Sequence, residues 1–290
     1  MKYWLNHAVE ENKGPVHIKI EDEVITYRHY YQYEKIINVH AGGFHIEPAK
    51  AAIGPTVQQC NDQKGQRRWE TLVKKGVTTT LIMMPVKKAS QLDHVTEQSL
   101  NLLNNVPIDY LIVPSVHSRQ LTPAFMRQLL RRNFPVVEIY FTSLSECPYV
   151  AWDWIKQALG PEPLSFIFRF PPPDSAEEQI EKNKWEKALS SHFHIVTFEN
   201  GALLSKNEMQ TIGLYPVKGT VARGDADYLL YYESKRVNQV DRHVSEGQPP
   251  DIVVLRGKVL KAGHQVQLLK GFGRCCNAFL PGRLRSIQRV

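Results

Sequence analysis

The sequence has few cysteines and no long hydrophobic run. Its 290 residues include four cysteines, Cys60, Cys147, Cys275 and Cys276. None of them forms the C-x-x-C spacing of a zinc or redox site, and adjacent cysteines rarely bridge each other, so we expect reduced structural thiols. No apolar run approaches the roughly 20 residues that span a bilayer. The first residues are too polar for a signal peptide, and we expect a cytoplasmic protein without membrane association.

Motifs for nucleic-acid binding are also missing, although the net charge is +7. Lys and Arg are scattered, with short clusters such as Arg67-Arg68 and Arg131-Arg132. A basic surface without such a motif is typical of a solvated protein face, so we expect no nucleic-acid partner. The G-x-S-x-G elbow of serine hydrolases and the dinucleotide-binding fingerprint are absent as well.

The chain begins with a series of predicted strands between residues 2 and 46. The stretch VHIKIEDEVITYRHYY alternates around an acidic turn, Glu21-Asp22-Glu23, and this pattern predicts a β-hairpin. The next stretch, KIINVHAGGFHIEP, predicts a strand pair or one bent strand with its kink at Gly42-Gly43.

From about residue 66 the pattern changes to helices that alternate with strands. QRRWETLVKKG predicts an amphipathic helix, and VTTTLIMMP a buried strand. The alternation continues to a last helix, SKNEMQTIG, which ends at Gly213. Strands separated by helices imply parallel βαβ units, and we count five or six strands between residues 49 and 213. A complete eight-unit barrel takes about 250 residues, so a barrel here is abbreviated or open, and its open edge must be covered.

The stretch from Gly213 to Tyr232, GLYPVKGTVARGDADYLLYY, returns the chain to strands. Pro216 stops the preceding helix, and Asp225 and Asp227 have short carboxylates suited to turn amides, so we interpret them as turn residues. YLLYY, DIVVLRGKVLKAG and HQVQLLKGFGR then predict strands. We therefore expect a small β-sandwich made of residues 1–48 and 214–290, with a (β/α) barrel-like domain at residues 49–213 inserted in it.

The stretch from Gly213 to Tyr232 resembles a segment of the cyclic amidohydrolases, such as hydantoinase, dihydropyrimidinase, allantoinase and dihydroorotase. In that family it is the segment where the chain leaves the barrel and re-enters a small β-sandwich. The Gly42-Gly43 step and the helix followed by GVTT are similar to the same family. The resemblance implies an α/β fold, a TIM-barrel-like domain plus a discontinuous β-sandwich. It also implies hydrolysis of a cyclic C–N bond with one or two divalent metals, at the carboxyl ends of the strands.

The metal ligands that the resemblance implies are missing from the sequence. An alignment through Gly42-Gly43 and Pro48 puts the family's His-x-His pair near Gly54 and Thr56. On the fourth strand, Glu138 and Tyr140 stand in place of a lysine, and on the fifth Arg169 stands in place of a histidine. Arg is not a metal ligand. We therefore expect no metal cofactor; a divalent metal such as zinc would be needed only if a relocated site remains.

Other polar residues at or just beyond the strand ends could form a residual pocket. Arg169 and Lys87 could bind a carboxylate or a phosphate, or Arg169 could pair with Glu138 or Glu199. His192 and His194 share one face of a predicted strand but lie at its start, where metal sites of barrels are uncommon. The pocket candidates are Lys87, His117, Glu138, Tyr140, Arg169, Glu199 and Asn200.

Three hypotheses follow for the function. The first is an amidohydrolase-like protein that has lost metal-dependent hydrolysis and acts in binding or assembly, as a homo-oligomer or with an amidohydrolase-like partner. The second is a hydrolase of cyclic amides or ureides, dihydropyrimidinase-like or dihydroorotase-like, with a relocated site. The third is a metal-free binding protein for a small carboxylate or ureide. Fold resemblance alone is weak evidence for activity.

Overall fold

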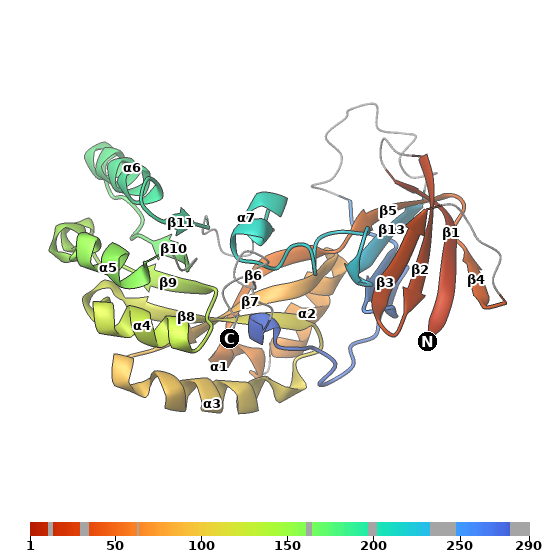
Figure 1. Cartoon of the computed structure of the whole chain (residues 1–290), viewed down its shortest axis with the longest axis horizontal. Coiled ribbons are helices and arrows are strands. Elements are labelled where there is room, and N and C mark those ends of the chain that lie inside the picture. The colour runs from red at the N-terminus through yellow and green to blue at the C-terminus, as the bar shows by residue number, and fades with distance from the viewer. Residues whose placement is uncertain are drawn as a thin grey trace.

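The structure, a computed structural model, describes residues 1–10, 14–29, 35–62, 64–160, 164–196, 202–232 and 248–278. Figure 1 shows two sheets side by side, one of them covered by helices. The expected α/β fold, with a parallel sheet and a separate, largely antiparallel sheet, is confirmed. Among the described residues, no helix is both long and apolar enough to cross a membrane.

The largely antiparallel sheet takes its strands from both ends of the chain. Its order is β12-β3-β2-β1-β5-β13-β14-β15-β16, with β4 beside β1. β5 and β13 join the two ends, because Leu230 pairs with Ile46. The strands are β1 (Lys2–Glu10), β2 (Gly14–Glu21), β3 (Val24–His29), β4 (Ile37–His40), β5 (Phe44–Pro48), β12 (Gly224–Asp225), β13 (Tyr228–Tyr232), β14 (Ile252–Leu255), β15 (Lys258–Ala262) and β16 (Gln265–Val266).

Local sequence explains the turns of this sheet. The predicted hairpin is present, and its turn residues Asp22 and Glu23 have φ angles of 46° and 77°. The predicted kink is present too: β4 and β5 both run parallel to β1, and the turn between them needs Gly43 at φ 85°. The strand predicted for HQVQLLKGFGR is largely wrong, since only Gln265–Val266 forms a strand. Further along this stretch, the Phe272 carbonyl accepts from the Arg256 guanidinium instead of a neighbouring strand.

The second sheet has six parallel strands in sequential order, β11-β10-β9-β8-β7-β6. Helices cover its outer face, as Figure 1 shows. The strands are β6 (Lys50–Thr56), β7 (Val77–Pro85), β8 (Asp109–His117), β9 (Val136–Tyr140), β10 (Ser165–Arg169) and β11 (His194–Ile195). The α-helices are α1 (Val57–Cys60), α2 (Gly65–Lys74), α3 (Leu92–Leu102), α4 (Pro123–Arg131), α5 (Trp152–Leu159), α6 (Ala176–Ser190) and α7 (Lys206–Thr211). Short 3₁₀ turns are η1 (Ala89–Gln91), η2 (Leu103–Asn105), η3 (Ser118–Gln120), η4 (Leu144–Tyr149) and η7 (Cys276–Ala278).

Capping residues begin and end these helices. Thr122 Oγ1 accepts from the Phe125 amide at 3.2 Å at the start of α4, and Ser175 does the same for Glu178 at the start of α6. Gly213 follows α7 with φ 79°, the left-handed conformation that ends a helix.

The six-stranded sheet does not close into a barrel through its own strands. After β11 the chain crosses to the other edge of the sheet, where residues 202–204 run antiparallel to β6. The Ile53 amide donates to Ala202 O at 3.1 Å, and the Leu204 amide to Ala51 O at 2.8 Å. One edge is thus covered by the chain itself, which was one of the alternatives that the strand count left open.

The inner face of this sheet is filled by later parts of the chain. Met209 and Ile212 pack with Leu81 and Val113 of the inner face, and buried Cys276 joins them. A second core lies between the outer face and the helices, and a third lies within the other sheet. The largely antiparallel sheet takes its strands from both ends of the chain, and the parallel sheet takes its strands from the residues between them. The predicted domain boundaries at 48–49 and 213–214 stay predictions.

Candidate functional site

Three candidate residues form a row across neighbouring strands. His117 at the end of β8 is in register with Tyr140 of β9, which is in register with Arg169 of β10. The His117 and Tyr140 rings meet edge to face with centroids 5.1 Å apart, and the Arg169 guanidinium lies 5.3 Å from the Tyr140 centroid. Parallel strands place their carboxyl ends on one rim, so the row stands where barrel enzymes carry their chemistry. We call these three residues the rim row.

Glu138 lies one step deeper than the rim row and is fully buried. Its register partner on β8, Ser115, donates a hydrogen bond to Oε2, and Arg169 Nε is 3.1 Å from Oε1. Burial raises the pKa of the Glu138 carboxyl, although the Ser115 hydrogen bond and the Arg169 charge act to lower it. The pairing of Arg169 with an acidic neighbour, one of the alternatives left open by the sequence, is therefore present.

The other end of the rim row is held by Glu146 of η4. Glu146 Oε1 is 3.6 Å from His117 Nε2, while Ser118 and Thr142 each donate to the Glu146 carboxylate at 2.6 Å. The Arg119 amide donates to His117 Nδ1 at 3.2 Å, so the neutral ring carries its proton on Nε2, which faces Glu146. Burial acts to raise the pKa of Glu146, but the hydrogen bonds from Ser118 and Thr142 outweigh it and lower the pKa.

The remaining candidates do not join this group. Lys87 follows β7 and is exposed, without a described contact to the rim row. Glu199 and Asn200 lie outside the described residues. His192 precedes β11 and its Nδ1 is 3.3 Å from Lys156 Nζ, so it does not share a strand face with His194. The structure thus brings together His117, Glu138, Tyr140 and Arg169.

The positions implied for the first two metal ligands do not fit a metal centre. A Cβ at Gly54 would collide with Thr80 Oγ1 and Leu81 O, so no side chain fits there. Thr56 ends β6 and serves as the N-cap of α1, in a capping box with Gln59. Together with the guanidinium of Arg169 on β10, these residues do not provide a ligand set for zinc.

A pocket of about 600 Å³ opens between the end of β10, α6 and β11. Its charged lining is mainly basic, with Arg169, Lys182 and Lys187 against Glu186, which is 3.7 Å from Lys182. The other lining residues are Phe168, Phe170, Asn183, Ser190, Ile195 and Val196. The pocket therefore combines an apolar wall with an excess of positive charge, which suits an anion that carries an apolar body.

A buried ionic cluster at the opposite ends of the strands was missed by the sequence interpretation. Lys218 Nζ lies 2.7 Å from Asp225 Oδ2 and 2.6 Å from Asp227 Oδ2, and it also contacts Asp109 Oδ2 at the start of β8. Burial acts to lower the pKa of Lys218, but the three carboxylates outweigh it and raise that pKa well above its usual value. Asp225 and Asp227 are therefore more than turn residues.

The Lys218 cluster joins the two sheets. One oxygen from each of its three carboxylates lies within 4.8 Å of the others, and a metal ion could be held by such a set. The Lys218 ammonium contacts all three and shares the compensation of their charge with the buried Arg256 guanidinium, which is 3.4 Å from Asp109 Oδ1. Asp109 belongs to the parallel sheet and Asp225 to the other, so the cluster ties them together.

The C-terminal segment binds next to the Lys218 cluster. The Arg274 amide donates to Asp109 Oδ1 at 2.8 Å, and Asn277 bonds both the amide and the carbonyl of Ile112 through its side chain, at 2.7 and 2.9 Å. Tyr110 donates its amide to Arg274 O at 2.9 Å. Residues 274–277 therefore supply hydrogen-bond partners to the first part of β8, which lies before the residues that pair with β9.

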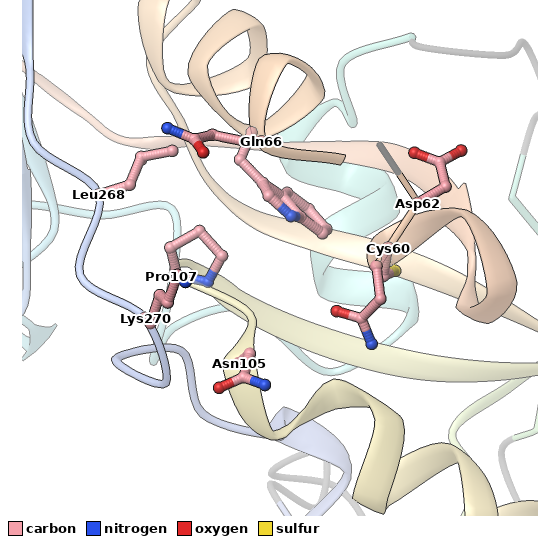
Figure 2. A pocket seen from close by; sticks show the side chains of 9 residues that line it. Cys60, Asp62, Gln66, Asn105, Pro107, Leu268 and Lys270 are labelled. Carbon is pink, nitrogen blue, oxygen red and sulfur yellow. The ribbon is translucent and has the colours of Figure 1, made fainter. Parts of the chain in front are cut away.

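A smaller pocket, of about 330 Å³, lies between α1, α2 and the C-terminal segment. Figure 2 shows Gln66, Asn105 and Lys270 around it. Its thiol, Cys60, donates to Thr56 O, and burial raises the pKa of this thiol to about 12, so it is not nucleophilic at neutral pH. All four cysteines are free, as expected.

Comparison with solved structures shows which known fold the chain shares. L-hydantoinase (dihydropyrimidinase) from Arthrobacter aurescens superimposes with a TM-score of 0.57 at 11% identity, covering 94% of this chain and 99% of that chain. Dihydropyrimidinase from Brevibacillus agri gives 0.57 at 10%, covering 95% and 98%. The chain has the fold of these hydantoinase and dihydropyrimidinase structures.

An enzyme named for a different activity also shares this fold. Atrazine chlorohydrolase TrzN from Arthrobacter aurescens, complexed with zinc, gives a TM-score of 0.53 at 10% identity, covering 91% of this chain and 96% of that chain. Neither a scan against protein-family models nor a comparison with curated proteins finds a match. A structural likeness at such low identity shows the fold alone, so the activity must be argued from the residues of the site.

Proposed function

We propose that this protein uses the amidohydrolase fold to bind a small carboxylate ligand, without the metal-dependent hydrolysis of the family. The observation that carries this proposal is the position of Arg169. It stands where the resemblance expects a metal ligand, it borders the rim row, and it lines the basic pocket at β10. A guanidinium at this position recognises an anion and repels a metal ion.

The chemistry of the pocket supports a carboxylate with an apolar body. Phe168 and Phe170 supply an aromatic wall, while Arg169, Lys182 and Lys187 supply the positive charge. A carboxylate can accept two parallel hydrogen bonds from one guanidinium, which fixes its orientation as well as its affinity. Small ureides that carry a carboxylate would use the same groups.

Calorimetric titration with benzoate, and with the uncharged isostere benzamide, tests this proposal. We expect benzoate to bind and benzamide to bind at least about tenfold more weakly, because the charge-assisted hydrogen bonds contribute roughly 1.5–3 kcal/mol. Arg169→Ala should abolish benzoate binding, whereas Arg127→Ala, at an exposed position of α4, should leave it unchanged. Since Arg169→Ala leaves Glu138 buried and uncompensated, the pair Arg169→Gln with Glu138→Gln serves as a second, charge-balanced variant.

Two results would overturn the proposal. One is benzoate binding that survives in both Arg169 variants. The other is stoichiometric zinc in protein purified without chelators, which would return the family's mechanism to consideration.

A second candidate function is hydrolysis of cyclic amides or ureides at a relocated site. The observation that favours it is Glu138, a buried carboxyl with a raised pKa beneath the rim row, since such groups can act as general acids or bases. Turnover of hydantoin, dihydrouracil, dihydroorotate or allantoin that is lost in Glu138→Gln would support it. No turnover with any added divalent metal would exclude it.

A further inference from the structure

Strand β1 contains an extra residue where it pairs with β2. The register shifts between Leu5 and Ala8, so the chain forms a β-bulge at Asn6 and His7. Leu5 and Ala8 both belong to the core of this sheet. Strict alternation would turn His7, two residues after Leu5, toward that core, whereas the bulge leaves its side chain exposed. The bulge therefore redirects His7 to the outer face of the sheet, opposite the core.

The redirection of His7 has an energetic cost. Its φ angle is 63°, in the left-handed region that residues other than glycine seldom occupy. Strained conformations of this kind persist only where the surrounding structure holds them, and they cluster at functional sites. The conformation of His7 is therefore a reason to expect a function for its side chain.

Three imidazole rings form a row on the outer face. β1 lies between β2 and β4, as Figure 1 shows, and the His7 ring lies between His17 of β2 and His40 of β4. The ring centroids of His7 and His17 are 4.8 Å apart, and those of His7 and His40 are 4.9 Å apart. Because metal–imidazole bonds are about 2.0–2.1 Å long, rings about 5 Å apart can reach one metal ion. We call His7, His17 and His40 the histidine row.

Asn6, the other residue of the bulge, orients His17. Asn6 Nδ2 donates to Asn38 Oδ1 at 3.0 Å, and Asn6 Oδ1 is 3.0 Å from His17 Nδ1. The Asn6 oxygen therefore accepts the Nδ1 proton, and the neutral His17 ring carries its lone pair on Nε2. A hydrogen bond of this kind fixes the tautomer and the orientation of metal-binding histidines. Burial and the nearby His7 lower the pKa of His17, which favours the neutral form that metals require.

We infer that the histidine row is a binding site for a late first-row divalent metal ion, with Cu²⁺ bound most tightly. Imidazole nitrogens select Cu²⁺, Ni²⁺ and Zn²⁺, whereas Mg²⁺ and Ca²⁺ prefer oxygen ligands. His7 is the central ligand, because it is the neighbour of both other rings. All three residues belong to the largely antiparallel sheet, so this site is not the one that the family resemblance places at the strand ends of the other sheet.

Calorimetric titration of the metal-free, full-length protein with Cu²⁺ tests this inference. The wild type should bind one Cu²⁺ per chain, and electron paramagnetic resonance should show coupling to more than one imidazole nitrogen. His7→Gly removes the central ring, and glycine adopts the positive φ without strain, so the variant should fold. It should bind Cu²⁺ at least about 10–100-fold more weakly, since even the loss of an outer-shell partner has that effect.

Further variants separate the row from isolated histidines. His17→Gln and His40→Gln should each weaken Cu²⁺ binding by at least about tenfold. His264→Gln is the matched control, because His264 is an exposed histidine between β15 and β16, and it should leave the affinity unchanged. Circular dichroism of each metal-free variant checks that it is folded.

Thermal unfolding gives a second measurement that does not depend on the copper signal. Ni²⁺ bound to the folded protein should raise the melting temperature of the wild type and of His264→Gln, and should not raise that of His7→Gly. The same variants identify the location of any zinc found in the purified protein. Zinc held by the histidine row is lost in His7→Gly, whereas zinc at the strand ends of the parallel sheet is kept.

Three results would overturn the inference. The first is an equal affinity for Cu²⁺ in the wild type and His7→Gly, which would mean an adventitious ion only. The second is a wild-type spectrum with coupling to a single nitrogen or to none. The third is a loss of binding in His264→Gln as large as the loss in His17→Gln.

Discussion

Replacing Lys218 with methionine removes the only lysine ammonium of the buried ionic cluster. Lys218 contacts Asp109, Asp225 and Asp227 and is 2% exposed, so the methionine leaves three buried carboxylates without this charge. Removing one partner of a buried ion pair costs about 3–5 kcal/mol. For a chain of this size, roughly 2 °C is lost per kcal/mol, so the melting temperature should fall by about 6–10 °C.

The loss of stability in Lys218→Met should depend on pH. Without the ammonium, the folded state holds the carboxylates at raised pKa values, above those of the unfolded chain. A carboxyl with a raised folded pKa favours the folded state below its unfolded pKa, about 3.9, and loses that contribution as pH rises through the folded pKa. Lys218→Met should therefore be more destabilised relative to wild type at pH 7 than at pH 5.

Guanidinium unfolding at both pH values measures these differences. Lys182→Met is the control, because Lys182 makes an exposed ion pair to Glu186 and should change the free energy of unfolding by no more than about 0.5 kcal/mol. A Lys218→Met variant as stable as the control, or one whose loss of stability does not grow with pH, would refute the role we give to the cluster.

Two further predictions concern single residues of the parallel sheet and its helices. Glu138→Gln removes a buried carboxyl with a raised pKa. Such a carboxyl stabilises the wild-type fold at low pH, and this contribution is lost as pH rises. Urea unfolding should therefore show the variant gaining stability relative to wild type between about pH 5 and 8. Thr122→Ala removes the N-cap of α4 and should lower the free energy of unfolding by about 1 kcal/mol, with Thr71→Ala, in the middle of α2, as the matched control.

The sequence predicted the elements with strong local patterns. VTTTLIMMP coincides with β7, and the last helix of the alternation ends at Gly213 as predicted, because each feature depends on neighbours within a few residues. The acidic hairpin turn was equally local, since Asp22 and Glu23 are polar residues between two alternating segments. Periodicity and helix ends depend on short stretches of sequence, so these elements can be predicted from those stretches alone.

Interactions between distant segments could not be read in this way. Asp225 and Asp227 look like turn residues until Lys218 is brought against Asp109, far earlier in the chain. The covering of β6 by Ala202 and Leu204 uses backbone groups, which carry no residue signature. At the candidate site the result was mixed. The sequence placed His117, Tyr140 and Arg169 at strand ends, and the register of β8, β9 and β10 brings them side by side. Ser115 and Glu146 were found only through their contacts.

The binding of residues 274–277 beside β8 has a consequence for folding. The amide of Tyr110 bonds Arg274, and both backbone groups of Ile112 bond Asn277, which lies 165 positions later in the sequence. Contacts of such sequence separation form slowly, because the long intervening loop must first be closed. We therefore expect this part of the β8 edge to be paired late in folding and to be open to pairing with another chain until then.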